Sequence, residues 1–122
     1  MPNKILLVEG SRTQALRFQL EMLRYGLTVE IAGSGEAGLD AARRHPPDVI
    51  VLDAELPEVS GFSICRALKM HPTTAHIPVV LLTHRDSAGQ ADGLDMGAVD
   101  CIPKDPFAEH NLIELLRYLG VV

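Results

Sequence analysis

Short apolar runs alternate with amphipathic stretches along the whole chain. The runs with the pattern of strands are Ile5–Val8, Thr28–Ile31, Val49–Leu52, Val79–Leu82 and a weaker Val99–Ile102. The first, third and fourth of these runs are continuously apolar, which is typical of strands covered on both faces of a sheet. The stretches that follow the runs have helical periodicity. The pattern therefore predicts five successive strand–helix units.

Leucines mark the first and last of the predicted helices. In the first helix they recur at i, i+4 and i+7, and the residues are Leu16, Leu20 and Leu23. Gly26 follows them at a position where a glycine commonly ends a helix. In the last helix the inner stripe consists of Leu112, Leu115, Leu116 and Leu119. Both spacings indicate amphipathic helices.

Serines and prolines mark the ends of the middle helices. Ser34 is placed to cap the second helix, which ends before Pro46. Ser60 is placed to cap the third helix, which ends near Pro72. Asp86 begins the fourth helix. Each of the first four helices thus has a start or a stop signal in the sequence.

Five repeats of strand then helix predict an α/β domain with a parallel sheet, right-handed crossovers and helices on both faces. In such open sheets, ligands bind beyond the carboxyl ends of the strands. The residues that close the strands therefore become the candidate functional residues. Those with reactive or charged side chains are Glu9, Asp53, Thr83 and Lys104.

Composition narrows the class of protein. The 122 residues, 47% of them hydrophobic and 22% charged, suit one globular domain over residues 1–122. No apolar run approaches the roughly 20 residues that span a bilayer, and no signal peptide is visible, so we expect a cytoplasmic protein without a membrane partner. The net charge of −5 and the scattered Lys and Arg argue against direct nucleic-acid binding. Two distant cysteines do not form a disulfide or zinc pattern.

An acid, a hydroxyl and an ammonium group end three neighbouring parts of the predicted sheet. Asp53 closes the strand "DVIVLD", Thr83 closes "IPVVLLT", and Lys104 follows the fifth run. A carboxylate at the end of a central strand is partly desolvated, so it requires a cation, a donor or a function. A phosphorylated carboxylate would use all three groups, because lysine neutralises phosphoryl charge and a hydroxyl donates to a phosphoryl oxygen.

These segments resemble the receiver domain of bacterial response regulators. The similar stretches are "ILLVEGSRTQ", "LDAELPEVSGFSICRALK", "IPVVLLTH", "GLDMGAVDCIPK" and "PFAEHNLIELLRYL". The most specific element is D-x-x-L/M-P-x-x-x-G, which is matched by Asp53, Leu56, Pro57 and Gly61. Thr83 and Lys104 follow in the order of the family. The resemblance covers residues 4 to 119.

The resemblance implies a flavodoxin-like (βα)5 sandwich with strand order 2-1-3-4-5. It implies that Asp53 accepts a phosphoryl group from a sensor histidine kinase or a phosphotransfer protein, with Thr83 and Lys104 contacting the phosphoryl oxygens. Switching would alter the face of helix 4, strand 5 and helix 5, which would act on a downstream effector or form a homodimer. Any effector or kinase domain would lie outside this chain. Catalysis would be limited to self-phosphorylation and autodephosphorylation.

The chain departs from the family at the expected Mg2+ site. The family ends strand 1 with two adjacent acids, whereas this chain has Glu9 and Gly10. These positions would hold the metal with Asp53 and the backbone carbonyl of Glu55. Three interpretations are open: Glu9 reaches inward, Glu55 supplies the missing carboxylate, or the metal site is weak and the domain signals without phosphorylation.

Two further departures concern the fifth strand and its loop. Cys101 stands where the family usually has an aromatic ring, and we expect it to act as a small buried hydrophobe. Asp105 separates Lys104 from Pro106. Because a cis bond before a residue other than proline costs about 2.5–4 kcal/mol, we predict a trans Lys104–Asp105 bond. We also expect Asp105 to pair partly with Lys104.

Two alternatives belong to other functional classes. The first is a pseudo-receiver that serves as a protein-interaction module whatever its phosphorylation state. The second is a nucleotide- or flavin-binding domain, because "GSGEAG" at residues 33–38 matches G-x-G-x-x-G and Asp53 lies 20 residues beyond its first glycine. That fingerprint belongs after the first strand of its unit, and here it follows the second.

Overall fold

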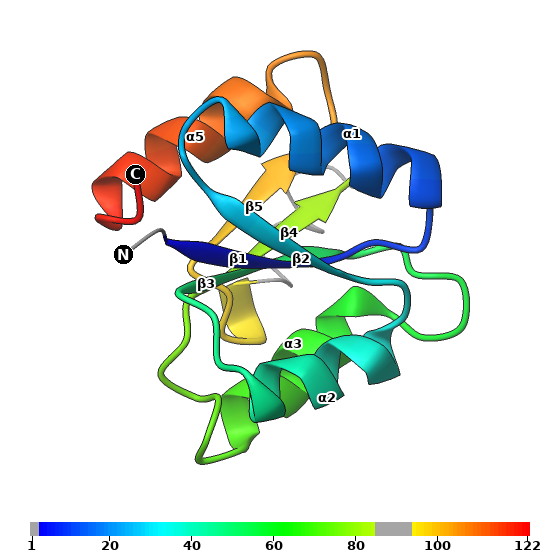
Figure 1. Cartoon of the computed structure of the whole chain (residues 1–122). Coiled ribbons are helices and arrows are strands. Elements are labelled where there is room, and N and C mark those ends of the chain that lie inside the picture. Colours follow the sequence, from blue (N-terminus) through cyan, green and yellow to red (C-terminus); the bar gives the residue numbers. More distant parts are fainter. Residues whose placement is uncertain (1–2, 85–93) are drawn as a thin grey trace.

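Five parallel strands form one sheet in the order β2-β1-β3-β4-β5 (Figure 1). The computed structural model describes residues 3–84 and 94–122. The strands are β1 (Lys4–Val8), β2 (Thr28–Ala32), β3 (Val49–Asp53), β4 (Val79–Thr83) and β5 (Asp100–Pro103). Each agrees with a predicted run to within one residue at either end. The predicted fold class and strand order are confirmed.

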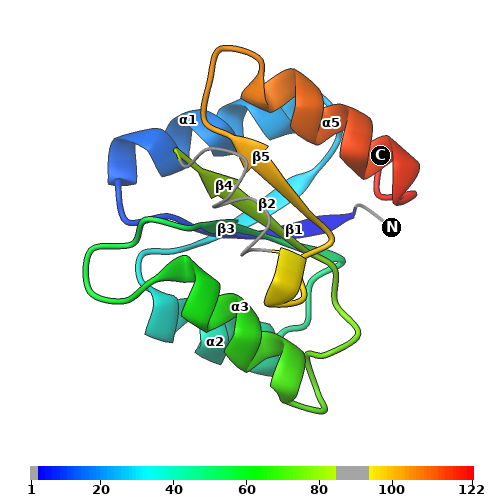
Figure 2. The same ribbon diagram turned by 180° about the vertical axis from the view of Figure 1, so that it is seen from behind.

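Helices cover both faces of the sheet. They are α1 (Arg12–Leu23), α2 (Gly35–Arg44), α3 (Gly61–Met70) and α5 (Ala108–Tyr118). α1 and α5 lie on one face and α2 and α3 on the other, as both views show (Figures 1 and 2). The helix predicted to begin at Asp86 starts outside the described residues. Among the helices of residues 3–84 and 94–122, none has the length and apolar character that crossing a membrane requires.

The predicted capping residues do cap their helices. The hydroxyl of Ser34 accepts a hydrogen bond from the backbone N–H of Ala37 at 3.1 Å. The hydroxyl of Ser60 accepts one from Phe62 N–H, also at 3.1 Å. Each bond satisfies a backbone donor that has no partner within the helix. Gly26, with φ at +74°, turns the chain after α1 as predicted.

The core consists of two apolar layers, one on each face of the sheet. β3 lies at the centre, and all five of its residues are buried. Successive side chains of β3 point to opposite faces of the sheet. Ile50 therefore packs in the layer of α2 and α3, and Val51 packs in the layer of α1 and α5. A strand covered on both faces is held firmly, and its last residue, Asp53, is therefore placed with little freedom.

The leucines that predict α1 lie on the outer side of that helix. Leu16, Leu20 and Leu23 are exposed, and Leu20 reaches 66%. The residues that α1 buries are Ala15, Phe18 and Met22. The helix itself is confirmed, but the apolar residues that face the core are not the leucines from which the helix was predicted. The leucines of α5 behave otherwise: Leu112 and Leu116 are fully buried, as the inner stripe requires.

Two of the three glycines of the "GSGEAG" stretch, Gly35 and Gly38, have a packing role. A Cβ atom at Gly38 would lie 2.6 Å from Cγ2 of Val8, and one at Gly35 would lie 2.7 Å from Cδ1 of Ile64. Both distances are too short for carbon atoms, so glycine allows α2 to approach β1 and α3 closely. These contacts account for the second and third glycines of the G-x-G-x-x-G spacing, and no contact of this kind accounts for Gly33.

Candidate functional site

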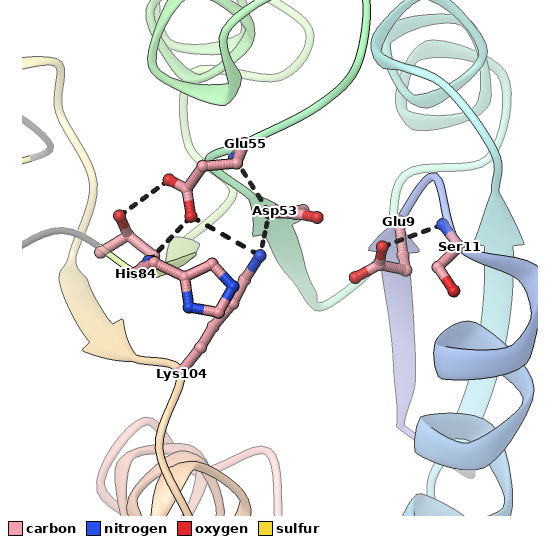
Figure 3. Close-up of polar contacts among 7 residues, drawn as sticks. Glu9, Ser11, Asp53, Glu55, His84 and Lys104 are labelled. Atoms are coloured by element: carbon pink, nitrogen blue, oxygen red, sulfur yellow. Dashed lines mark hydrogen bonds and ion pairs between the residues drawn. The ribbon is translucent and has the colours of Figure 1, made fainter.

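The carboxyl ends of the strands gather four polar side chains at one edge of the sheet. Asp53 pairs in register with Leu82, directly before Thr83. Thr83 in turn pairs with Pro103, directly before Lys104. Glu9 follows the last residue of β1. Glu9, Asp53 and Thr83 are buried. Lys104, from the loop after β5, extends to Asp53 and Glu55 (Figure 3). The structure therefore brings together the residues that the sequence selects.

Asp53 and Lys104 form a largely buried ion pair. The Nζ atom of Lys104 lies 2.5 Å from Oδ1 of Asp53, and their side chains are 18% and 7% exposed. The same oxygen accepts a hydrogen bond from the backbone N–H of Glu55 at 2.9 Å. A buried carboxylate requires such partners, because desolvation of an unpaired charge is costly. Lysine thus balances the charge of Asp53 inside the site.

The carboxylate of Glu55 has two hydrogen-bond donors and one ionic partner. The hydroxyl of Thr83 donates to Oε2 at 2.9 Å, and the backbone N–H of His84 donates to Oε1 at 2.8 Å. Lys104 Nζ lies 3.6 Å from Oε1. In Figure 3, the Glu55 side chain is directed toward His84 and Lys104 and away from Glu9. The sequence singles out Glu55 only as a metal ligand, and no residue pattern identifies the His84 amide.

Glu9 lies on the other side of Asp53 (Figure 3). Its Oε1 atom accepts a hydrogen bond from the backbone N–H of Ser11 at 3.0 Å. Burial raises the pKa of Glu9, and the negative charge of Asp53 raises it further, against the opposing effects of the Ser11 amide and Lys104. Two acidic groups are thus crowded together at the ends of β1 and β3.

The crowded acids are the residues that could hold a metal ion. Mg2+ favours oxygen ligands, is often held by one or two carboxylates, and keeps several waters. Glu9 and Asp53 fit that requirement, and a cation would relieve their mutual repulsion. Gly10 adds no oxygen, and the Glu55 carboxylate is engaged elsewhere. Within residues 3–84 and 94–122, no three His, Cys, Asp or Glu side chains gather closely enough to hold a metal.

Glycines shape the site as well. A Cβ atom at Gly61 would lie 2.1 Å from the backbone oxygen of Asp53, so the first residue of α3 must be glycine for the loop to pack as it does. This contact is the physical reason for the last position of the D-x-x-L/M-P-x-x-x-G motif. At Gly10 a Cβ atom would lie 3.1 Å from Cδ of Pro57, a tight but smaller conflict.

The loop after β5 confirms one prediction and corrects another. The Lys104–Asp105 bond is trans, as predicted. The expected pairing of Asp105 with Lys104 is wrong. Asp105 instead accepts a hydrogen bond from the backbone N–H of Phe107 at 2.8 Å, at the start of α5. Lys104 turns inward to Asp53 and Glu55, where two carboxylates attract it, and Asp105 accepts from the amide of the residue that precedes α5.

Cys101 is buried in β5, as expected of a small hydrophobe. Burial is the main cause that raises the pKa of its thiol, and Asp100 adds to the effect. Cys65 of α3 lies in the same core layer, and burial raises the pKa of its thiol to about 11. Both thiols therefore remain protonated at neutral pH and behave as core residues.

Comparisons with known proteins agree with this geometry. Residues 5–117 match the family model of the response regulator receiver domain. The chain is 37% identical over 120 residues to response regulator MprA of Mycobacterium sp. (strain KMS), covering 98% of this chain and 51% of that protein. The chain thus spans about half the length of such relatives.

Solved structures show the same fold. Chemotaxis response regulator CheY4 of Vibrio cholerae has a TM-score of 0.87 at 27% identity, covering 98% of this chain and 99% of that one. The BeF3-activated DrrB receiver domain has a TM-score of 0.81 at 30% identity, again covering 98% and 99% of the two chains.

Proposed function

The chain belongs to the receiver-domain family of two-component response regulators, and we propose from this premise that Asp53 is its phosphorylation site. The phosphoryl donor is the phosphohistidine of a sensor histidine kinase or of a phosphotransfer protein. One observation carries the proposal: Lys104 lies 2.5 Å from the Asp53 carboxylate at the strand edge where Thr83 also ends. Receiver domains interact with histidine kinases and effector domains, so a partner of each kind is expected.

In the proposed reaction, a carboxylate oxygen of Asp53 attacks the phosphorus atom of the donor. An oxygen–phosphorus bond forms and the phosphorus–nitrogen bond to histidine breaks. The electron pair leaves with the imidazole nitrogen. Lys104 neutralises charge on the phosphoryl oxygens, and the Thr83 hydroxyl and the His84 backbone N–H donate to them. Catalysis of this kind depends on positioning and electrostatics, and no other enzymatic activity is proposed.

Receiver domains generally bind Mg2+ at the acidic pocket. In this chain Glu9, Asp53 and the backbone carbonyl of Glu55 would hold the ion, which would supply positive charge to the transferring phosphoryl group. We propose that its affinity is reduced, because Gly10 replaces an acid and Glu55 turns its carboxylate toward Thr83. Weak metal binding would slow phosphorylation without abolishing the site.

The output is part of the same proposal. Phosphorylation would change the face formed by helix 4, β5 and α5, and this face would contact an effector domain, an effector protein or a second copy of the chain. The net charge of −5 favours a protein partner over direct contact with nucleic acid. A cytoplasmic location, where such kinases act, completes the proposal.

A second candidate function is a pseudo-receiver that binds partners independently of phosphorylation. It is favoured by the ionic contacts already present, since Lys104 and Thr83 are engaged by carboxylates of the chain itself. Such a domain would keep one conformation whether or not a donor is available.

Acetyl phosphate with varied Mg2+ tests the proposed function. We expect intact-protein mass spectrometry to detect the addition of one phosphoryl group, which disappears in Asp53→Asn. The same experiment on Glu58→Gln, an exposed acid of the same loop, provides the control for loss of one charge. Absence of the phosphorylated species even at high Mg2+ would overturn phosphorylation of Asp53 and favour the pseudo-receiver.

A further inference from the structure

The Glu55 carboxylate lies among the donors that a phosphoryl group on Asp53 would use. Resting on the proposed function, we infer that Glu55 is an internal anion that occupies the phosphoryl-binding place until phosphorylation displaces it. Glu55 is thus a positioning residue of the unphosphorylated state and a competitor of the incoming group. The step from Asp53 to phospho-Asp53 becomes an exchange of one anion for another.

The contacts support this exchange atom by atom. The Thr83 hydroxyl and the His84 backbone N–H each donate to one oxygen of Glu55, at 2.9 and 2.8 Å. Carboxylate and phosphoryl oxygens accept charge-assisted hydrogen bonds at such distances alike. Lys104 Nζ is 2.5 Å from Asp53 and 3.6 Å from Glu55, so one ammonium group bridges the two carboxylates. A phosphoryl group bound to Asp53 would need the same ammonium group.

Charge requires Glu55 to leave. A phosphoryl group carries nearly two negative charges, and Glu55 would add a third beside the single ammonium group of Lys104. Negative charges that share the same hydrogen-bond donors are close together, and they repel strongly where the surroundings are partly desolvated. The incoming group and the Glu55 carboxylate therefore exclude each other from the same donors.

Exposure shows which partner can move. The Glu55 side chain is 34% exposed and belongs to the loop after β3, so it reaches water by rotation of its own bonds. Asp53 ends a buried strand, and Thr83 ends another. The main chain of Glu55 stays in place through its N–H bond to Asp53 while the carboxylate swings out. The exchange thus requires no movement of the sheet.

The test compares wild-type protein with Glu55→Ala, Glu55→Gln and the control Glu58→Gln at saturating Mg2+. The rate of phosphorylation by acetyl phosphate and the affinity for beryllofluoride are measured. During phosphorylation an Asp53 oxygen–phosphorus bond forms, the phosphorus–oxygen bond to acetate breaks, and acetate leaves with the electron pair. We expect about tenfold faster phosphorylation and tighter binding in Glu55→Ala, the equivalent of about one net charge-assisted hydrogen bond. Glu55→Gln should be intermediate, and Glu58→Gln unchanged.

The outcomes separate the inference from the proposed function. Phosphorylation of wild-type protein with no gain in either Glu55 variant overturns the inference and leaves the function standing. Phosphorylation of the Glu55 variants alone would identify Glu55 as the residue that occupies the phosphoryl-binding place, and it would overturn both the displacement of Glu55 and the proposed phosphorylation of wild-type protein. Failure of every protein to react, including both Glu55 variants, overturns both.

The backbone amide resonance of His84 provides a readout that a merely structural role would not move. Its hydrogen bond to Glu55 should shift the proton signal downfield in wild-type protein. The signal should move upfield in Glu55→Ala and return downfield when beryllofluoride is added. An unchanged signal in Glu55→Ala overturns the inference whatever the rates. Thermal unfolding checks that each variant is folded. If Glu55→Ala is unfolded, the comparison with wild-type protein is made with Glu55→Gln instead.

Discussion

Lys104 and Asp53, 51 positions apart in the chain, meet at the edge of the sheet with 2.5 Å between Nζ and Oδ1. The strand register produces this meeting, because β3 pairs with β4 and β4 with β5 so that all three end at the same edge. The lysine is thus in place before any phosphoryl donor arrives.

The ion pair should contribute measurably to stability. We expect Lys104→Met to lower the free energy of unfolding by about 2 kcal/mol at pH 7, because it leaves the Asp53 carboxylate buried without its counter-charge. In an Asp53→Asn background the same substitution should cost little. Chemical denaturation of the four proteins forms the double-mutant cycle. Additive losses would contradict a direct contribution of the pair.

Glu9 should make stability depend on pH. Its pKa is raised above the ordinary value of 4.5 in the folded protein, so the fold holds the protonated form better than the ionised form. The resulting stability is present at low pH and is lost as pH rises through the folded pKa. In metal-free buffer we therefore expect Glu9→Gln to be more stable than wild-type protein at pH 7.

The difference between the two proteins should shrink as pH falls toward 4.5, where Glu9 becomes protonated. Thermal unfolding across this range, in the presence of a chelator, measures the effect. Adding Mg2+ should raise the stability of wild-type protein more than that of Glu9→Gln. A difference that stays constant with pH would mean that Glu9 is ionised at no cost in the fold.

Gly10→Asp should strengthen metal binding. An added carboxylate beside Glu9 and Asp53 would supply a further oxygen ligand, and we expect about tenfold tighter Mg2+ binding, or about 1.4 kcal/mol. Isothermal titration calorimetry measures it. Gly10→Ala is the matched control, because it brings the same Cβ atom 3.1 Å from Pro57 without the carboxylate. Equal affinities in the two variants would show that the missing acid is not the defect.

The two sides of α1 should differ in how much stability they lose on truncation. Met22 is fully buried, so Met22→Ala should lower the free energy of unfolding by about 2–5 kcal/mol through loss of packing. Leu20 is 66% exposed, and Leu20→Ala should change it by about 0.5 kcal/mol or less. Urea denaturation compares them. A large loss in Leu20→Ala would mean that this leucine is buried in solution.

The sequence predicts the strands, the helix caps and the identity of the site residues because each depends on local chemistry. Continuous apolar runs can only be buried strands or helices, and serine oxygens satisfy the amides that follow them. The prediction is weaker where tertiary packing determines which side of an element faces the core. α1 carries two apolar sets, and periodicity alone does not say whether Leu16 or Phe18 faces the sheet.

The role of Glu55 shows a second limit. Its spacing from Asp53 relates it to a metal, and nothing local connects it to Thr83 or to the amide of His84. The contacts of Glu55 depend on the rotamer of one flexible side chain. That rotamer is set by charged and polar groups that come from separate strand ends. Asp105 was misplaced for the same reason, since the competition between Lys104 and the amide of Phe107 is settled only in three dimensions.

The contact between Gly61 and the main chain of Asp53 has a mechanical consequence. At Gly61 no side chain separates α3 from the end of β3, and Gly61 N–H also donates to Ala54 oxygen at 2.9 Å. Side chains can absorb a small displacement by changing rotamer, whereas two backbones in direct contact cannot. A shift of the backbone at Asp53 would therefore press directly on the first residue of α3, with no side chain at Gly61 to take up the displacement.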